Sequence, residues 1–338
     1  MTSTNTHVDH AKVTVIVPAK NEEKNMGLLL DSLINQSHIA DEIVVADDGS
    51  ADATAAIVRK YSEKFPVKLV NVHQPSSPGK ARNVAIKASN ADILAFMDGS
   101  MVADRNWLKN LLAPLLIDPQ LDITFGNVIY DTKSRIRPIS DFQKGLVFWA
   151  YPPEHSVRCN IPASAIRKQS FEKIGYFKEI KRSEDLFFFD LIDKLNFKYE
   201  YVRKGIAYYF EYPQTYKEVF QKWRFSVKIN TQHQISGRGF FRQLFMKGAF
   251  LVALLIVVAL LARDLRWALL FLVLIALRFI PRIYLHKKLS IYFLKRPHLW
   301  PQLFCLFVTL ETARFCGFVT GLWEILKSVK KRRKLRQF

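Results

Sequence analysis

Residues 42–50 read EIVVADDGS, a short β-branched run that ends in two aspartates, a glycine and a serine. The run is continuously apolar, which predicts a strand buried on both faces, and its polar end predicts a tight turn. Ser50 is suited to cap the helix that we expect through Tyr61. The stretch therefore predicts a strand, a turn with clustered carboxylates and a helix, in that order.

The same alternation continues on both sides of this stretch. Three further buried strands are expected at residues 12–17, 67–72 and 93–97, with helices at residues 22–36 and about 80–89. The order is β-α-β-α-β-α-β with continuously apolar strands. This order predicts an α/β fold whose central sheet is mostly parallel and covered by helices on both faces.

The carboxyl ends of the predicted strands carry acidic and polar residues. In sheets of this kind the ligand binds outside these ends, and here they hold Pro18, Asp47, Asp48 and Asp98. Neither a GxGxxG turn nor a P-loop follows the first strand, which disfavours a dinucleotide-binding dehydrogenase and a P-loop enzyme. The acidic ends suit metal-bridged phosphates, or hydrogen bonds to a base or a ribose.

Four short motifs occur in order at these strand ends. They are VIVPAKNE (15–22), VVADDGSADAT (44–54), GKARNVAI (79–86) and AFMDGS (95–100). Each is weak alone, because a DDGS turn is also an ordinary turn. Together, at these spacings, they resemble the N-terminal half of the family 2 glycosyltransferases, which have the GT-A fold. The resemblance continues through AIRKQSFEKIGYF, SEDLFFFDL and QKWRF, and covers roughly residues 12–230.

The resemblance implies a nucleotide-sugar site at the strand ends. By it, Pro18, Lys20 and Glu22 border the nucleotide pocket. Asp48 hydrogen-bonds the uracil or an equivalent base, with Arg82 beside it. The resemblance thus implies that these five residues, together with Asp98 and Ser100, bind the donor.

The metal site implied by the resemblance is incomplete. Asp98 lies near the ribose and diphosphate and acts as metal ligand, but the second Asp of the family's D-x-D is Ser100 here. A hydroxyl is a much poorer ligand for a hard divalent cation. Either Asp98 alone anchors Mg²⁺ or Mn²⁺ through the phosphates, or a carboxylate such as Asp104 assists, or metal dependence is weak. Loss of activity is a further alternative. We keep Ser100 among the donor-binding residues.

Two adjacent carboxylates, Glu184 and Asp185, resemble the family's ED motif and are the predicted catalytic residues. By this resemblance the aspartate takes the proton from an acceptor hydroxyl in one inverting displacement at the anomeric carbon. A positioned base is required because an alcohol is a poor nucleophile at neutral pH. The alternative is a solvated pair that caps the helix before the apolar run 186–189.

Residues 221–225, QKWRF, resemble the Q-x-x-R-W motif of processive family members, with Phe225 in place of Trp. The resemblance assigns Gln221, Arg224 and Phe225 to the acceptor and the diphosphate: the arginine meets the diphosphate, and the ring stacks on an acceptor sugar. If Arg224 reaches the diphosphate, it partly offsets the missing carboxylate at Ser100. An amphipathic helix that leads to the membrane, with its cations at the headgroups, is the equal alternative.

The net charge of +20 lies mainly in the C-terminal third of the chain. Up to Gly237 there are 31 Lys+Arg against 27 Asp+Glu, which gives +4; from Arg238 onward there are 19 against 3, which gives +16. Because this excess flanks the most apolar stretches, it predicts the cytoplasmic face of a membrane rather than a nucleic-acid site. We therefore divide the chain into a GT-A domain, residues 1–236, and a membrane domain, residues 237–338.

The membrane domain is predicted to contain a transmembrane hairpin at about residues 245–280 and a basic interfacial segment at 281–300, which holds no carboxylate. Residues 301–326 are apolar but contain Glu311 and Arg314. We expect them to be interfacial or re-entrant, followed by a basic tail, because a third full span would place that tail outside. A soluble domain with a very apolar helical core is the alternative.

These expectations combine into one interpretation. Residues 1–11 lack the apolar core of a signal peptide, so we expect a cytoplasmic catalytic domain on a multi-pass protein of the cell membrane. The predicted activity is transfer of a sugar from a UDP- or GDP-sugar to a hydroxyl of a glycolipid, a polyprenyl-linked saccharide or a polysaccharide, as in cell-envelope glycan biosynthesis. The near alternative is a polyprenyl-phosphate glycosyltransferase, which needs no general base. A non-catalytic membrane scaffold that keeps the fold is the alternative of another class.

Overall fold

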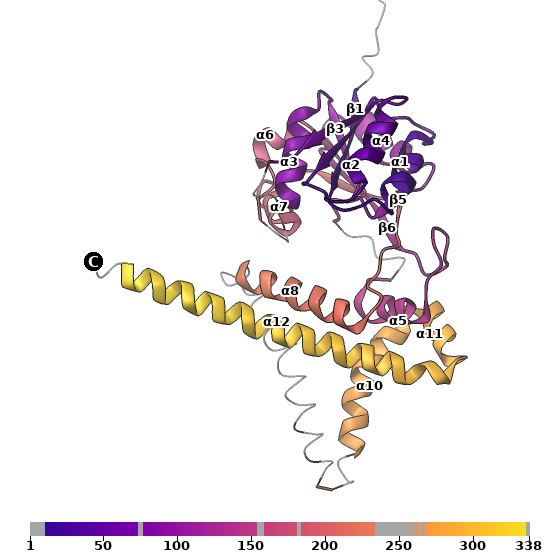
Figure 1. Cartoon of the computed structure of the whole chain (residues 1–338), viewed down its shortest axis with the longest axis vertical. Coiled ribbons are helices and arrows are strands. Elements are labelled where there is room, and N and C mark those ends of the chain that lie inside the picture. Colours follow the sequence, from indigo (N-terminus) through magenta and orange to yellow (C-terminus); the bar gives the residue numbers. More distant parts are fainter. Residues whose placement is uncertain are drawn as a thin grey trace, which may run out of the picture. The chain divides into compact units, whose positions relative to one another are not determined.

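A computed structural model describes most of the chain (Figure 1). The described residues are 11–73, 77–153, 159–180, 184–233, 256, 260, 263–264 and 268–335. Contacts divide the chain into two compact units, residues 1–131 with 154–211 and residues 132–153 with 212–338. Each unit has buried apolar side chains of its own.

An eight-stranded sheet forms the centre of the first unit. Its strands are β1 (Val13–Ala19), β2 (Glu42–Asp47), β3 (Val67–Asn71), β4 (Ile93–Phe96), β5 (Met101–Ala103), β6 (Ile123–Tyr130), β7 (Ser164–Arg167) and β8 (Tyr199–Tyr209). They lie in the order β3-β2-β1-β4-β7-β6-β8-β5. β1 is parallel to β2 and β4, β2 to β3, and β6 to β8, whereas β7 is antiparallel to β4 and β6, and β5 to β8. The predicted α/β fold with a mostly parallel sheet is confirmed.

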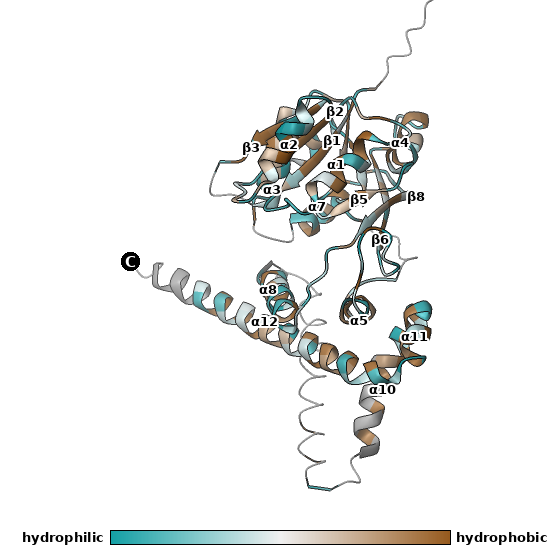
Figure 2. Ribbon diagram, turned by 45° about the vertical axis from the view of Figure 1, so that its right-hand side comes forward, coloured by the Kyte–Doolittle hydropathy of each residue, from teal (hydrophilic) through white to brown (hydrophobic). Residues whose placement is uncertain are grey.

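Helices cover both faces of this sheet. They are α1 (Met26–Ile34), α2 (Thr54–Ser62), α3 (Pro78–Ala88), α4 (Trp107–Ile117), α6 (Ser170–Ile174) and α7 (Glu184–Lys194). Alternate side chains of β1 enter two different cores. Val15 and Val17 belong to the core that includes α1, α2 and α4, whereas Ile16 belongs to the core that includes α3, α6 and α7. A continuously apolar strand is expected where both faces are buried in this way, and Figure 2 shows hydrophobic strands among the helices.

The helix that follows the DDGS turn begins later than the sequence predicts. α2 starts at Thr54, so Ser50 is not its N-cap. Instead, the Ser50 hydroxyl hydrogen-bonds the carboxylate of Asp47 and accepts a bond of 2.9 Å from the backbone N–H of Asn21. The serine thus connects two loops that are distant in sequence, which a local helix-start pattern does not contain.

The second unit is helical. Its elements are α5 (Asp141–Ala150), α8 (Tyr216–His233), α10 (Ala268–Leu285), α11 (Lys287–Leu294), the 3-10 helix η2 (Pro297–Leu299) and α12 (Trp300–Leu335). α12 packs along α8. Gly317 permits this approach, because a Cβ there would lie 2.3 Å from the carbonyl oxygen of Arg224. The Trp149 indole N–H on α5 donates a bond of 2.9 Å to the carbonyl of Leu303, so α12 also holds α5.

The division by contacts differs from the boundary after residue 236 that the sequence predicts. The sequence assigned α5 and α8 to the catalytic domain, whereas their packing places them with the C-terminal helices. The change of composition along the chain marks where the apolar segments begin. It does not show that two earlier helices pack against α12, because that packing joins segments far apart in sequence.

The predicted transmembrane hairpin at about residues 245–280 lies largely outside the described residues, and α10 covers its end. Among the described residues, one helix, Pro297–Ser328, is long and apolar enough to cross a membrane, and 44% of its most apolar stretch is buried. It contains the segment 301–326. The interfacial or re-entrant placement of that segment stays a prediction.

His286 connects α10 and α11 and makes the stability of the second unit sensitive to pH. Its ring is buried, lies 5.8 Å from the ring of Phe148 between centroids, and has no partner for Nε2 among the described residues. Burial, and after it the charge of Arg282, lowers the pKa of His286 to about 4 from its usual 6.5. The unfolded chain takes up this proton at a higher pH than the folded chain. This part of the stability is therefore fully present above about pH 6.5 and is lost as the pH falls towards 4.

We expect His286→Phe to remove this acid-dependent loss of stability, because the ring that must stay neutral is gone. The measurement is Tm against pH between neutral and mildly acidic conditions. His298, an exposed histidine of the same region, supplies the control, and His298→Phe should keep the wild-type profile. A His286→Phe profile as steep as that of the wild type would contradict the assignment.

Candidate active site

The ends of β1 and β2 bring the first predicted donor-binding residues together. Pro18 pairs with Ala46 in the parallel ladder. Just beyond the strands, Lys20 Nζ lies 3.3 Å from Asp48 Oδ2, with side chains that are 52% and 11% exposed. The pair thus joins an accessible cation to a largely buried carboxylate at the edge where a ligand is expected.

Hydrogen bonds between two loops hold this edge in place. The backbone N–H of Glu22 donates to the Thr54 hydroxyl at 2.7 Å, and the N–H of Ala51 donates to the Asn21 side chain at 2.9 Å. Asn21 has a positive φ of 56°, and Gly49 in the facing turn has a φ of 70°. Asn and Gly are the residues that adopt this conformation most readily. The two motifs therefore form one structural unit, which supports Lys20 and Asp48.

A buried arginine connects the third motif to the fourth and to α7. Arg82 on α3 donates from Nη2 to Asp98 Oδ1 at 2.9 Å and from Nη1 to Glu184, and its side chain is 6% exposed. Burial alone would lower the pKa of Arg82, but the two carboxylates outweigh it and raise that pKa. The guanidinium also lies 5.6 Å from the ring centroid of Phe177. The sequence did not predict this double ion pair of Arg82, nor the contact of Lys20 with Asp48, and a place for Arg82 beside the base stays a prediction.

The two predicted catalytic residues occupy the first turn of α7 but differ in environment. Glu184 is buried and held by Arg82. Asp185, the next residue, accepts a hydrogen bond of 2.9 Å from the N–H of Leu186. Burial, and after it the charge of Glu184, raises the pKa of Asp185, while Arg82 acts in the opposite direction. A carboxylate with a raised pKa accepts a proton more readily, so Asp185 is the better candidate for a general base.

Comparison with known proteins shows the family to which one segment of this chain belongs. Residues 14–175 match the profile described as glycosyl transferase family 2. This segment is a family 2 glycosyltransferase domain.

Two relatives show how far the sequence similarity extends. The poly(ribitol-phosphate) beta-N-acetylglucosaminyltransferase TarS of Staphylococcus aureus is 39% identical over 105 residues, which are 30% of this chain and 18% of TarS. The probable glycosyltransferase YdaM of Bacillus subtilis is 26% identical over 187 residues, 52% of this chain and 44% of YdaM. The matched segments make up less than half the length of either relative.

A solved structure shows the same fold. The mannosyltransferase PcManGT from Pyrobaculum calidifontis, in complex with GDP-Man and Mn²⁺, has a TM-score of 0.54 and 19% identity and covers 94% of this chain and 88% of that chain. The glycosyltransferase domain therefore has the GT-A fold that the sequence motifs predict.

The glycosyltransferase domain offers few protein ligands for a divalent metal. Among the residues that the structure describes, no group of three or more His, Cys, Asp or Glu side chains is arranged to hold a metal ion. Asp98 shares one oxygen with Arg82, and Ser100 lies in the turn between β4 and β5. Mg²⁺ is commonly bound by one or two carboxylates together with substrate phosphates. The residues present fit a cation that Asp98 holds jointly with a diphosphate, and they do not fit an all-protein cage.

Glu22 adds a second carboxyl group close to Asp98. A Cβ at Gly99 would lie 2.8 Å from the Glu22 side chain, so the glycine makes room for it. The carboxylate of Glu22 accepts a hydrogen bond of 2.7 Å from the side chain of Asn25. Burial raises the pKa of Glu22 to about 7, and the nearby charges of Glu211 and Asp98 act in the same direction. Glu22 therefore lies close to Asp98, and its place at the nucleotide pocket stays a prediction.

Replacing Ser100 by Asp tests the incomplete metal site. We expect Ser100→Asp to strengthen the stabilisation by Mn²⁺ in the presence of UDP or GDP, because a carboxylate is a better ligand than a hydroxyl for this cation. The measurement is Tm with nucleotide over a series of Mn²⁺ concentrations. Ser100→Ala is the control and should give no such gain. An unchanged Mn²⁺ dependence in Ser100→Asp would show that residue 100 does not face the metal.

The predicted acceptor residues lie in the second unit. Gln221, Arg224 and Phe225 are all exposed on α8, and the side chain of Phe225 is 41% exposed. Their surroundings support either interpretation of the motif, since α8 packs against α12 through Gly317 and leaves these side chains accessible. Contact of Arg224 with a diphosphate and of Phe225 with a sugar stays a prediction.

Sequence reasoning missed the contacts that support the site, although it had selected Glu184 as a catalytic residue. Asn21, Ser50 and Thr54 join the two loops through hydrogen bonds, and Glu184 holds Arg82 across 102 positions of the chain. Asn21, Ser50 and Thr54 lie inside the motifs that resemble the family, so their place in these motifs could have indicated a structural role. The Arg82–Glu184 pair had no local signal, because only the fold brings α3 and α7 together.

Proposed function

We propose that the protein transfers a sugar from a nucleotide-sugar to an acceptor held at a membrane. The observation that carries the proposal is the buried Arg82, which links Asp98 at the end of β4 to Glu184 beside Asp185. This linkage joins Asp98, which lies in the segment 14–175 that matches family 2, to the residue next to the candidate base, which follows that segment. Side chains held in this way lower the cost of orienting donor and acceptor for reaction.

In the proposed reaction each side chain has one task. Lys20 and Asp48 bind the base of the nucleotide, and Asp98 lies near the ribose and the diphosphate. Asp185 takes the proton of an acceptor hydroxyl while the new oxygen–carbon bond forms and the bond from the anomeric carbon to the diphosphate breaks, with inversion. A divalent cation, when bound at Asp98, would neutralise charge on the departing nucleotide. Arg82 holds Asp98 and Glu184 in place and does not itself exchange a proton.

The choice of a UDP- or GDP-sugar has support from the relatives. PcManGT was solved with GDP-Man, and the name of TarS includes the transfer of N-acetylglucosamine. The matched segment is only part of TarS, so we do not assign the sugar or the acceptor in the name of TarS to this chain. We propose a nucleoside diphosphate sugar as the donor class.

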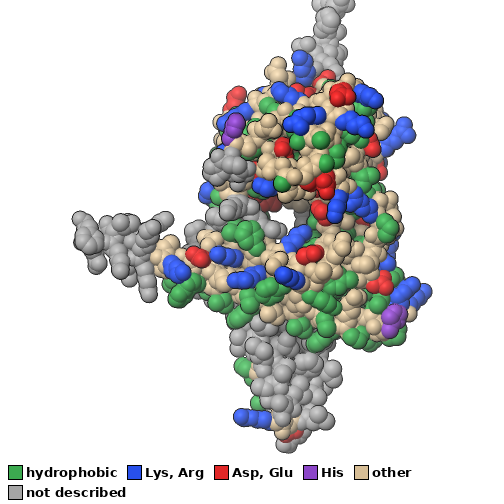
Figure 3. Space-filling view, viewed as in Figure 1, with side chains coloured by type: hydrophobic (Ala, Val, Ile, Leu, Met, Phe, Trp, Pro, Cys, Tyr) green, Lys and Arg blue, Asp and Glu red, His purple; other side chains and the backbone are tan. Residues whose placement is uncertain are grey.

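The membrane acceptor is supported by the second unit. The helix Pro297–Ser328 is apolar and incompletely buried, and Ile291, Leu294 and Trp300 are between 51% and 60% exposed. Hydrophobic and basic side chains lie together on the helical surface in Figure 3. This combination is typical of a protein surface that contacts anionic lipid. We propose a multi-pass protein of the cell membrane with a cytoplasmic catalytic domain.

A thermal-shift screen tests the donor class. We expect one family of nucleotide-sugars to raise the Tm of the full chain, with a larger rise in the presence of Mn²⁺, because a ligand that binds only the folded state stabilises it by mass action. Release of UDP or GDP from the same compounds then tests turnover. No stabilisation and no nucleotide release with any donor, with Mg²⁺ or Mn²⁺ present, would favour a non-catalytic scaffold.

A further inference from the structure

An apolar cavity lies among the helices of the second unit. Its volume is about 300 Å³, and its wall is formed by nine residues of α5, α10, α11 and α12. Phe148, Phe279 and Phe293 form part of the interior, and Ser290 supplies the one hydroxyl of the lining. The cavity is distinct from the candidate active site and from the exposed face of α8, and two of its lining residues, Leu294 and Trp300, also belong to the exposed apolar surface described above.

The polar groups of the lining already have partners within the protein. The Ser290 hydroxyl bonds to the carbonyl oxygens of His286 and Ile283, at 2.9 and 3.0 Å. The indole N–H of Trp300 donates to the carbonyl of Phe293 at 3.0 Å. A buried water needs two to four polar partners, and this wall offers it almost none. The interior therefore suits a hydrocarbon rather than water or a polar ligand.

The mouth of the cavity is open and apolar. Three of the lining residues are strongly exposed: Ile283 at 42%, Trp300 at 51% and Leu294 at 60%. Next to them, Ile280 and Ile291 are 62% and 54% exposed without lining the cavity. Exposed apolar patches of this kind mark a site for a partner or a membrane. A chain that enters the cavity would thus continue onto an apolar surface.

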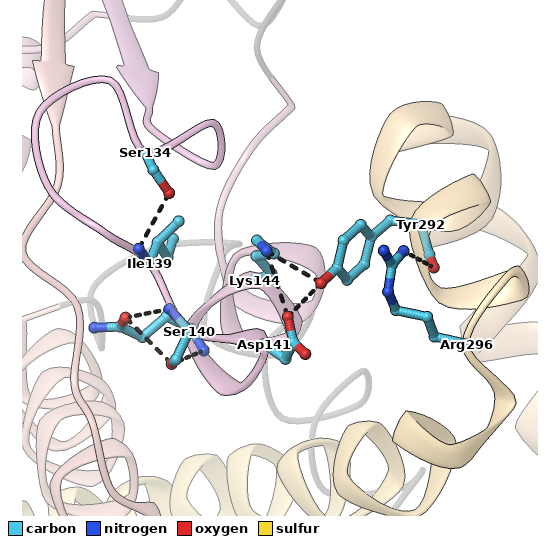
Figure 4. Close-up of polar contacts among 8 residues, drawn as sticks. Ser134, Ile139, Ser140, Asp141, Lys144, Tyr292 and Arg296 are labelled. Atoms are coloured by element: carbon cyan, nitrogen blue, oxygen red, sulfur yellow. Dashed lines mark hydrogen bonds and ion pairs between the residues drawn. The ribbon is translucent and has the colours of Figure 1, made fainter.

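The basic residues of the segment that lines the cavity favour a lipid with an anionic headgroup. The segment 281–300, which supplies five of the nine lining residues, carries Lys and Arg and no Asp or Glu. Arg296 lies 4.0 Å over the ring of Tyr292, whose hydroxyl meets Asp141 and Lys144 of α5 (Figure 4). Arg296 follows the lining residue Leu294 by two positions, and basic residues near a lipid surface attract anionic lipid.

We propose that this cavity binds one acyl chain of an anionic phospholipid, with the phosphate at the basic segment 281–300. The chain would fill a dry space lined by apolar side chains. The site would fix the second unit in the lipid surface. It does not depend on the sugar chemistry proposed for the first unit.

The test uses the full chain in vesicles that contain a phosphatidylglycerol with a photoactivatable diazirine in one acyl chain. Irradiation followed by peptide mass spectrometry should place adducts on peptides that hold Ile283, Leu294 and Trp300. Ile283→Trp should reduce this labelling several-fold, because the larger ring occupies the cavity. Ile280→Trp, on the same helix and also exposed but outside the lining, should label as the wild type does.

A second pair of variants on α11 guards against a folding defect. Leu294→Trp should reduce labelling, and Ile291→Trp should not. All four positions are exposed by 42% or more, so circular dichroism and Tm are expected to stay close to those of the wild type. If either Ile283→Trp or Leu294→Trp loses helicity, the other of these two variants and its control decide the result.

Three outcomes would overturn the proposal. Equal labelling of the cavity variants and their controls would mean that the region only lies against bulk lipid. Competition by a polyprenyl phosphate but not by unlabelled phosphatidylglycerol would assign the cavity to an isoprenoid chain. Absence of adducts on the lining peptides would leave another protein segment as the occupant. Binding of nucleotide-sugars, measured on the same samples, reports separately on the proposed function.

Discussion

Replacing Asp185 with Asn is expected to reduce sugar transfer to a hydroxyl acceptor by about 10²–10⁴-fold, the contribution of a positioned general base. The amide has nearly the shape of the carboxylate but cannot accept the acceptor's proton. Binding of the nucleotide-sugar should remain, because Asp185 is assigned to the acceptor and not to the donor. The measurement is the initial rate of transfer, alongside the thermal shift by the donor.

The pH dependence gives Asp185 a second test. Burial raises the pKa of this carboxyl, and the active form of a base is the deprotonated one. Transfer by the wild type should therefore fall, as the pH is lowered, at a pH above the usual range of an aspartate. The residual activity of Asp185→Asn should lack this fall.

Asp190 supplies the matched control on the same helix. Its carboxylate is 57% exposed and pairs with Lys194 at 2.6 Å, so Asp190→Asn should leave the rate unchanged. Wild-type turnover in Asp185→Asn would contradict the base assignment. It would favour an acceptor phosphate, which is already anionic and needs no base.

The fold of the first unit could be predicted because its signals are local. The runs 15–17 and 43–46 are apolar at every position, and nearly all of their side chains are buried. The turn at Asp47–Ser50 was also visible in the sequence. The start of α2 was not, because Ser50 serves a contact with Asn21 from another loop. Local patterns thus predict elements, and contacts between loops decide their ends.

The motifs select the candidate residues of the site, but they do not predict which of these residues contact one another. Arg82, Asp98, Glu184 and Asp185 were all selected by their motifs, yet the pairing of Arg82 with Glu184 spans 102 positions and follows only from the packing of α3 beside α7. The same holds for the second unit. In the sequence, Gly317 is simply one residue of an apolar helix. Its close contact with the backbone of Arg224 can be seen only in the folded structure.

The Arg82 ion pairs lead to the second large expected effect. We expect Arg82→Met to lower the free energy of unfolding of the first unit by about 3–5 kcal/mol, the usual cost of leaving a buried charge without its partner. Glu184 is the charge in question, since its side chain is 7% exposed. Donor binding should weaken as well, because Asp98 loses the group that orients it. Denaturant unfolding and the donor thermal shift measure the two effects.

Two variants separate this explanation from a simple loss of packing. In Arg82→Met/Glu184→Gln the buried charge is gone, so part of the stability should return, whereas a packing defect alone would persist. The double-mutant cycle then gives the coupling between the two side chains directly. Lys20→Met provides the exposed comparison: its pair with Asp48 has a cation that is 52% accessible, and exposed pairs contribute only about 0–1 kcal/mol. Equal losses in Lys20→Met and Arg82→Met would mean that burial does not determine the strength of these ion pairs. No recovery in the double variant would mean that Arg82 supports the site through its contact with Phe177 rather than through Glu184.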